Sequence, residues 1–347
     1  MGAYSIEGYD FRLTEFFPMS VFDQITEVRV SRPGMILEEA EARERRPQLT
    51  KDGKLTILAA DHPGRMVTSY LDDPIVMGDR QQYLGRVLRV MTTQGVDGVM
   101  GTTDVIEDLL IVNHLIKEAG GEGFLDGRVM LGSMNRSGLS GSAWEMDDQM
   151  TSWSPDSLCM LGLDGAKIMF RLCLEEAELS NRTLAYCAQA ITDCNELGLP
   201  VFVEPLPVEH KDGKYKLKRN PNDIIKVIGV AFALGDSSRS SWLKIPYCDD
   251  YARVARATTA PCLMLGGEST GDPTNILSDF AQGMTAGNNV RGALVGRNVT
   301  FPGSDDPLAV ALAVNAIVHE GAGADQAVDI LMAGRNKNFD ALTKYLA

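Results

Sequence analysis

The sequence has few residues of the kinds that build metal centres or disulfide frameworks. Its histidines are His62, His114, His210 and His319, which are far apart and lack the i,i+4 spacing of zinc hydrolases. The six cysteines form no CxxC pair and lie scattered among apolar segments, so neither a disulfide framework nor a zinc site is expected. We therefore expect a reaction that uses no metal and no cofactor.

Long apolar runs and an excess of positive charge are also lacking. No apolar run reaches the roughly 18 residues of a membrane span, and the N-terminus has no charged-then-apolar signal pattern. The 33 Lys and Arg residues against 47 Asp and Glu give a net charge of −14, which disfavours general binding to nucleic acid or anionic membranes. We expect a cytoplasmic protein without nucleic-acid or membrane partners. A local basic pocket for an anionic substrate remains compatible with this charge.

Short apolar runs alternate with longer amphipathic segments from Leu55 onward. The eight runs are 55–61, 95–102, 128–135, 165–172, 200–206, 241–247, 261–267 and 292–298. Helical patterns lie between most of them, for example at 79–94, 183–197 and 222–233. Eight successive β-then-α units predict an α/β fold, the (β/α)8 TIM barrel. A doubly wound open sheet is the alternative, but no GxGxxG motif follows the first run.

Residues 1–50 precede this regular pattern. They contain helix-like segments at 18–28 and 38–46 separated by a proline and a glycine. We interpret residues 1–50 as an N-terminal extension that packs on the barrel or on another subunit, and residues 51–347 as the barrel domain.

Charged residues stand within or just after four of the apolar runs. Asp61 follows the first run, and Lys167, Glu204 and Lys244 lie in the fourth, fifth and sixth. Active sites of such barrels form at the C-terminal ends of the strands, and alternation points Lys167 into the interior. Because buried charges are costly unless paired, these residues predict either a catalytic set or an ion-pair network that only fills the barrel.

Lys244 is the candidate nucleophile of this set. A lysine in a dry site loses its proton more readily than a free lysine and can then attack as a neutral amine. The nearby positive charge of Lys167 would favour the same proton loss. We expect Lys244 to form a Schiff base with a ketone, Asp61 to shuttle protons, Glu204 to act as base, and Lys167 to orient Glu204.

Glycines and an arginine follow the last two runs. Gly266, Gly267 and Gly296 allow a phosphate to approach the backbone closely, and Arg297 adds a charge-assisted donor. Loops after the seventh and eighth strands commonly bind phosphate in this fold. The alternative is that these are turn glycines beside a surface arginine.

The most basic stretch of the chain is 210–219, in which Asp212-Gly213 predicts a hairpin turn. It is either a solvated hairpin or one that overhangs the barrel mouth and attracts an anionic substrate. Candidate partners for a substrate carboxylate are three further residues, Arg65, Arg136 and Arg171.

At these residues the chain resembles the class I (Schiff-base) aldolases of the deoxyribose-phosphate aldolase-like barrel group. Archaeal-type fructose-bisphosphate aldolases share the look of Ala60-Asp61-His62, Leu243-Lys244-Ile245, Leu265-Gly266-Gly267 and Val295-Gly296-Arg297-Asn298-Val299. Segments 162–167 and 202–204 are more similar to tagatose-bisphosphate aldolases. The similarity is patchy and runs from about Leu55 to Ala316.

The resemblance implies cleavage of a phosphorylated ketose or ketoaldonate to dihydroxyacetone phosphate and an aldehyde, in an enzyme that often assembles into homo-oligomers. Leu206 stands where the fructose-bisphosphate group has a catalytic tyrosine, and His62-Pro63-Gly64 replaces a turn of the tagatose group. The pattern is also similar to aldolases proposed for inositol breakdown, whose substrate is 6-phospho-5-dehydro-2-deoxy-D-gluconate. The alternatives are a fructose- or tagatose-bisphosphate aldolase, a barrel isomerase or acyl transferase that reuses the lysine, and a non-catalytic sugar-phosphate-binding barrel.

Overall fold

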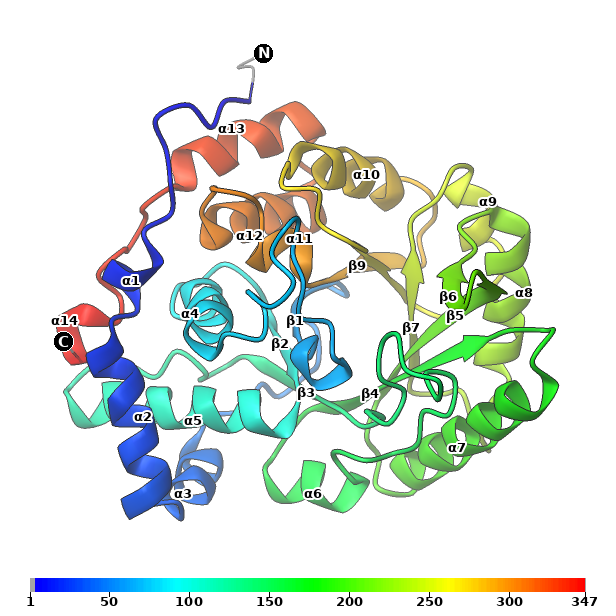
Figure 1. Ribbon diagram of the computed structural model, residues 1–347, viewed down its shortest axis with the longest axis horizontal. Coiled ribbons are helices and arrows are strands. Elements are labelled where there is room, and N and C mark those ends of the chain that lie inside the picture. Colours follow the sequence, from blue (N-terminus) through cyan, green and yellow to red (C-terminus); the bar gives the residue numbers. More distant parts are fainter. Residues whose placement is uncertain (1–3, 347) are drawn as a thin grey trace.

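Eight parallel strands form a closed ring surrounded by helices in the computed structural model, which describes residues 4–346 (Figure 1). The strands are β1 (Leu55–Ala60), β2 (Gly98–Gly101), β3 (Val129–Ser133), β4 (Gly165–Leu172), β5 (Val201–Lys211), β7 (Ser241–Pro246), β8 (Cys262–Leu265) and β9 (Val290–Val295). Their order is β4-β3-β2-β1-β9-β8-β7-β5, and pairing of β4 with β5 closes the ring. The predicted (β/α)8 barrel is confirmed, and each of the eight apolar runs overlaps one of these strands, although β5 continues beyond its run and β9 begins before its run.

The helices form the outer layer of the barrel. Those after the strands are α4 (Arg80–Met91), α5 (Thr103–Glu118), α6 (Pro155–Met160), α7 (Ala177–Glu196), α8 (Pro221–Phe232), α9 (Tyr251–Ala255), α10 (Thr274–Met284), α11 (Arg297–Thr300), α12 (Pro307–Asn315), α13 (Ala324–Gly334) and α14 (Thr343–Leu346), with a 3-10 turn η1 (Pro63–Arg65) and a π-helical turn η2 (Ala316–Glu320). Polar caps begin several of them. The side chain of Asp79 accepts a hydrogen bond from the Gln82 amide at 3.0 Å at the start of α4, which satisfies an otherwise unpaired helix donor.

Three N-terminal helices pack on the outside of the barrel. They are α1 (Leu13–Phe16), α2 (Met19–Ser31) and α3 (Met35–Ala42); α1 contacts α4, and α2 and α3 contact α5. Arg29 of α2 pairs with Asp108 of α5 at 2.7 Å. The helices α1 and α2 lie close to the C-terminal helix α14 (Figure 1), and Gln24 donates a hydrogen bond to the Leu346 carbonyl at 2.7 Å. Of the two expected positions for this extension, the structure shows it on its own barrel.

The barrel interior is apolar in its middle and charged toward the C-terminal ends of the strands. The apolar layer is made by Leu55, Ile57, Ala59, Met100, Val129, Leu131, Phe202, Leu263 and Leu294. The rings of Phe202 and Trp242 stack there with centroids 5.6 Å apart. Lys167 and Lys244 point into the ring above this layer, as alternation predicts, whereas Ile168 and Ile245 point out into the core beneath the helices.

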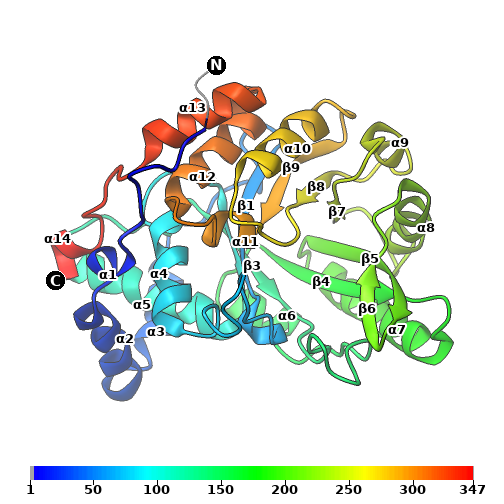
Figure 2. The same cartoon turned by 45° about the horizontal axis from the view of Figure 1, so that its top comes forward.

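The strand β5 continues past the ring and turns back as β6 (Lys214–Leu217). Val208 pairs with Leu217, and Lys211 with Lys214, in antiparallel register. Asp212 and Gly213 have φ angles of 56° and 71°, which is the left-handed geometry of a tight hairpin turn. The predicted hairpin is therefore confirmed, and Figure 2 shows β6 beside β5.

The N-terminal ends of β1 and β2 are held together by His319 of η2. Its ring nitrogens lie 2.8 Å from Asp52 and 2.8 Å from Asp97, and Asp97 also pairs with Arg46 at 2.9 Å. Burial lowers the pKa of His319, but hydrogen bonds with the two carboxylates outweigh it, so the pKa is raised above its ordinary value. This cluster lies opposite the strand ends that carry the candidate site.

A fully buried ion pair joins α4 to the start of α12. Arg89 contacts the two oxygens of Asp306 at 2.9 and 2.7 Å, and both side chains are 0% exposed. Asp306 also caps α12 by accepting a hydrogen bond from the Leu308 amide at 3.0 Å. Because the pair is bidentate and further hydrogen-bonded, its geometry offsets the cost of burying two charges.

Candidate active site

The four charged residues singled out in the strands meet at the C-terminal end of the barrel. Glu204 Oε2 lies 2.6 Å from Lys167 Nζ, and Glu204 Oε1 lies 3.0 Å from Lys244 Nζ. Lys167 Nζ is also 3.7 Å from Asp61 Oδ2. The side chains of Lys167 and Lys244 are 2% and 10% exposed, so the more accessible lysine is Lys244. All four line one cavity of about 560 Å³.

Glu204 is held as a carboxylate between two lysines. Burial alone would raise its pKa, but the charges of Lys167 and Lys244 outweigh this effect and lower the pKa to about 2. Burial favours the neutral form of a lysine as well, and it therefore lowers the pKa of Lys167 to about 8 against the attraction of Glu204 and Asp61. The geometry thus places an ionised carboxylate between two amines. One of them, Lys167, loses its proton at a pH closer to neutral than a free lysine does.

Asp61 has two partners that sequence reasoning did not assign to it. Ser133 at the end of β3 donates a hydrogen bond to Asp61 Oδ2 at 3.0 Å, and Arg136 contacts the same oxygen. Burial would raise the pKa of Asp61, but Arg136 and Lys167 hold it well below its ordinary value. Three cations (Arg136, Lys167 and Lys244) therefore face two carboxylates, and loss of one proton would make the cluster neutral.

His62 lies beside this cluster as a neutral imidazole. Burial lowers its pKa to about 3, with Asp61 opposing and the charge of Arg297 adding to the decrease. Its Nδ1 is 3.3 Å from the Tyr83 hydroxyl. A Cβ atom at Gly296 would lie 2.2 Å from His62 Cε1, so glycine at this position is required for the ring to occupy its place.

The predicted glycine and arginine residues line the same cavity. Gly266, Gly267, Gly296 and Arg297 lie along one wall, and Lys244 is on the adjacent strand. Burial lowers the pKa of Arg297, although Glu268 opposes this effect. The distance from Arg297 to Glu268 is 3.8 Å, and the Glu268 side chain is 81% exposed. Glu268 therefore neutralises the charge of Arg297 only weakly, and Arg297 remains able to bind an anion.

The three arginines considered for a substrate carboxylate are all ion-paired. Arg65 contacts Asp148 at 2.5 Å, Arg171 contacts Glu145 at 3.0 Å, and Arg136 contacts Asp61. Arg65 also donates to the Asn135 carbonyl at 2.7 Å, so it anchors the segment that follows β3. A ligand would have to compete with these carboxylates to engage any of the three.

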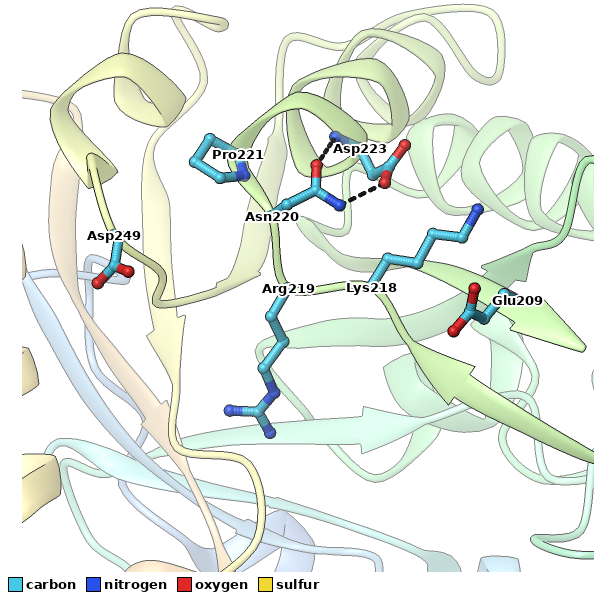
Figure 3. Close-up of a pocket in the computed structure, with 7 residues that line it drawn as sticks. All are labelled: Glu209, Lys218, Arg219, Asn220, Pro221, Asp223 and Asp249. Carbon is cyan, nitrogen blue, oxygen red and sulfur yellow. Dashed lines mark hydrogen bonds between the residues drawn. The ribbon is translucent and has the colours of Figure 1, made fainter. Parts of the chain in front are cut away.

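The β5–β6 hairpin borders the cavity. Tyr215, Lys216, Leu217 and Arg219 contribute to its lining, together with Leu206 of β5. A neighbouring pocket of about 680 Å³ lies beside the hairpin and is lined by Glu209, Lys218, Arg219, Asn220, Pro221, Asp223 and Asp249 (Figure 3). Of the two expectations for the basic stretch, the position of the hairpin favours the one in which it overhangs the barrel mouth.

The described part of the chain, residues 4–346, lacks two kinds of feature. No helix in this part of the chain is both long and apolar enough to cross a membrane. Within the same residues, no group of three or more His, Cys, Asp and Glu side chains has an arrangement that could hold a metal ion.

Two fructose-bisphosphate aldolases of known structure share this fold. The fructose-bisphosphate aldolase from Slackia heliotrinireducens superposes with a TM-score of 0.61 at 15% identity, covering 92% of this chain and 95% of that one. A Schiff-base-forming fructose-1,6-bisphosphate aldolase gives 0.55 at 20% identity, covering 82% and 100%. The chain thus shares the TIM-barrel fold of these two enzymes.

A closer relationship defines the family. The family model described as Cgl0159-like matches residues 53–318. The crystal structure of Cgl0159 from Corynebacterium glutamicum is 33% identical, with a TM-score of 0.80 over 88% of this chain and 98% of that one. The chain belongs to the Cgl0159-like family. No curated protein matches the sequence.

Proposed function

We propose that this protein is a class I aldolase in which Lys244 forms a Schiff base with a phosphorylated ketone. The observation that carries the proposal is the placement of Glu204 between Lys244 at 3.0 Å and Lys167 at 2.6 Å, at the C-terminal end of the barrel. A nucleophilic amine needs a proton acceptor within hydrogen-bond reach. The aldolase-like fold supports this assignment.

The reaction begins when neutral Lys244 Nζ attacks the ketone carbon. The ketone oxygen takes up a proton to give a carbinolamine, and loss of water gives an iminium. Glu204 then removes the proton from the hydroxyl group on the carbon that will become the aldehyde. The carbon–carbon bond breaks, and its electrons move into the iminium to form an enamine while the aldehyde leaves. Protonation and hydrolysis of this intermediate release dihydroxyacetone phosphate and restore the lysine.

Two further residues support proton movement. Lys167 orients Glu204 and keeps it ionised, and its pKa of about 8 makes it the group that first gives up the excess proton of the cluster. Lys244 can then pass a proton through Glu204 to neutral Lys167. We retain Asp61 as the candidate that shuttles protons during carbinolamine formation, assisted by the Ser133 hydroxyl 3.0 Å away.

The phosphate would bind at Gly266, Gly267, Gly296 and Arg297. Binding there fixes the ketone beside Lys244 and supplies the positioning part of catalysis. The substrate we propose is a phosphorylated ketose or ketoaldonate that yields dihydroxyacetone phosphate and an aldehyde, with 6-phospho-5-dehydro-2-deoxy-D-gluconate as one candidate. Fructose and tagatose bisphosphates are the alternatives. Leu206, which lines the cavity, supplies no hydroxyl where a tyrosine would act in the fructose-bisphosphate group.

Borohydride trapping tests the assignment. The protein is incubated with dihydroxyacetone phosphate, reduced, digested and analysed by mass spectrometry, with Lys244→Met and Lys167→Met as matched variants. We expect a reduced adduct on Lys244 that Lys244→Met abolishes. An adduct on another lysine, or none, would disprove the Schiff-base assignment, and binding without an adduct would indicate a sugar-phosphate-binding barrel. A panel of phosphorylated ketoses and ketoaldonates, scored for release of dihydroxyacetone phosphate, then identifies the substrate.

A further inference from the structure

We propose that Arg219, at the end of the β5–β6 hairpin, is a second arginine of the phosphate seat and determines the preference for phosphorylated over unphosphorylated ketones. This inference rests on the proposed function for the identity of the substrate. It adds a cation from the segment between β6 and α8 to a phosphate site otherwise built after β8 and β9.

The first observation is the closeness of Arg219 to the glycine pair. A Cβ atom placed on Gly267 would lie 2.9 Å from one terminal guanidinium nitrogen of Arg219 and 3.6 Å from the other. Gly267 has a φ of +71°, which disfavours any other residue. The guanidinium therefore lies against the Gly267 backbone, in a space that a side chain at this position would occupy.

The second observation is that no carboxylate in the described part of the chain lies within ion-pair distance of Arg219, although its charge reaches Asp279 and opposes the rise that burial causes in the pKa of that carboxyl. Within residues 4–346 its side chain donates no hydrogen bond and forms no ion pair with a carboxylate, in contrast to Arg65 and Arg171 across the cavity. Its charge acts on Arg297 and, together with burial, lowers the pKa of that residue. Two arginines held near each other without a strong carboxylate partner form a site that a bound anion would stabilise.

The third observation is that the chain on both sides of Arg219 is anchored. The Lys218 amide donates to the Pro207 carbonyl at 2.8 Å, and the Asn220 side chain caps α8 by accepting from the Asp223 amide at 3.0 Å. Figure 3 shows Lys218 and Arg219 leaving the chain in different directions, and of the two only Arg219 also lines the candidate active site. The backbone at Arg219 is thus fixed before a ligand binds, and only the exposed side chain has to be ordered, which limits the entropic cost of binding.

The chemistry of the seat fits a phosphomonoester. A guanidinium presents a planar fork of donors that matches phosphate oxygens. Arg219 lies against Gly267, and Arg297 follows the next strand. A phosphate between the two arginines would accept hydrogen bonds from both while the ketone faces Lys244. An unphosphorylated ketone such as dihydroxyacetone would reach Lys244 without using either arginine.

The test compares wild type, Arg219→Gln and the neighbouring control Lys218→Gln. Titration calorimetry measures binding of dihydroxyacetone phosphate and of inorganic phosphate to each protein. Borohydride trapping measures the concentrations of dihydroxyacetone phosphate and of dihydroxyacetone that give half-maximal adduct. For Arg219→Gln we expect both phosphate ligands to bind about 10- to 100-fold more weakly, as loss of a charged hydrogen-bond donor predicts, with dihydroxyacetone trapping unchanged. Lys218→Gln should change each value less than about 2-fold.

The outcomes separate this inference from the proposed function. Unchanged phosphate binding in Arg219→Gln, or equal losses for dihydroxyacetone and its phosphate, would overturn the role of Arg219 even if Lys244 forms an adduct. If wild type forms no adduct, the calorimetric comparison still decides whether Arg219 belongs to the phosphate seat. Arg219→Lys, which keeps the charge without the fork, should recover part of the lost affinity.

Discussion

Replacing Glu204 with glutamine tests the centre of the proposed mechanism with a change of one charge. The pKa of Glu204 is about 2 rather than its ordinary 4.5, a difference that corresponds to about 3 kcal/mol in favour of the carboxylate. A carboxyl whose pKa is lowered in the folded state contributes stability above its unfolded pKa and loses it as pH falls through the folded value. At neutral pH the contribution is fully present, so Glu204→Gln should lower the free energy of unfolding by up to about 3 kcal/mol.

The effect on activity should be larger than the effect on stability. Glutamine cannot accept the proton whose removal breaks the carbon–carbon bond, so kcat should fall about 100- to 10,000-fold, the usual contribution of a general base. Lys244 keeps its access to the ketone, so the adduct with dihydroxyacetone phosphate should still form, although more slowly because the proton route from Lys244 through Glu204 to Lys167 is lost. A coupled assay for released dihydroxyacetone phosphate measures kcat, and borohydride trapping measures the adduct.

Glu268→Gln is the matched control, because Glu268 lines the same cavity but is exposed and far weaker in its ion pairing. It should leave kcat within about 3-fold of wild type. A Glu204→Gln protein that is folded and cleaves substrate at a rate within about tenfold of wild type would refute the base assignment. Loss of the adduct in a folded protein would instead move the role of Glu204 to the earlier transfer of a proton from Lys244.

Three other measurements probe charges described above. The ratio kcat/KM should increase as pH rises through about 8, where Lys167 gives up its proton, and a profile that is flat from about pH 7 to about pH 9 would argue against this proton loss. The pKa of His319 is raised in the folded state, so its contribution to stability is complete below the unfolded pKa and is lost as pH rises through the folded one. Urea unfolding of His319→Gln should therefore show a greater loss of unfolding free energy at about pH 6 than at about pH 9. Equal losses would contradict a stabilising interaction of His319 with Asp52 and Asp97. Arg89→Met leaves Asp306 buried without its partner, so chemical denaturation should show an unfolding free energy lower by about 3 to 5 kcal/mol. The double variant Arg89→Met/Asp306→Asn should recover part of this loss. A double variant less stable than the single one would refute this account.

Much of the architecture follows from short-range patterns. Apolar runs of strand length, separated by amphipathic segments, suffice to predict eight β/α units, and alternation within β4 and β7 correctly points Lys167 and Lys244 into the ring. The Asp212-Gly213 turn is a local signal, and the hairpin it predicts is present. These features depend on neighbours within a few residues, which is why a single sequence reveals them.

Features that depend on distant partners could not be read in this way. Ser133 and Arg136 meet Asp61 because β1, β2 and β3 are adjacent and their ends lie level, a register that no local pattern reveals. The direction of Arg219 depends on how far β5 continues beyond the ring. Pairing of Arg171 with Glu145 was likewise hidden, because the carboxylate lies in an irregular loop.

The charged cluster at the barrel mouth has a consequence for folding. Asp61, Lys167, Glu204 and Lys244 come from the first, fourth, fifth and sixth strands of the ring, so no partial barrel that lacks one of these strands contains the whole set. In an open intermediate Lys167 would be solvated and would titrate near about 10.4, as a free lysine does, and Lys244 would lack its place beside Glu204. Because the proposed phosphate-binding residues follow β8 and β9, reactivity of Lys244 toward dihydroxyacetone phosphate should reach its full value only when these strands have also docked. The rate at which a reducible adduct becomes available during refolding would then report closure of the barrel.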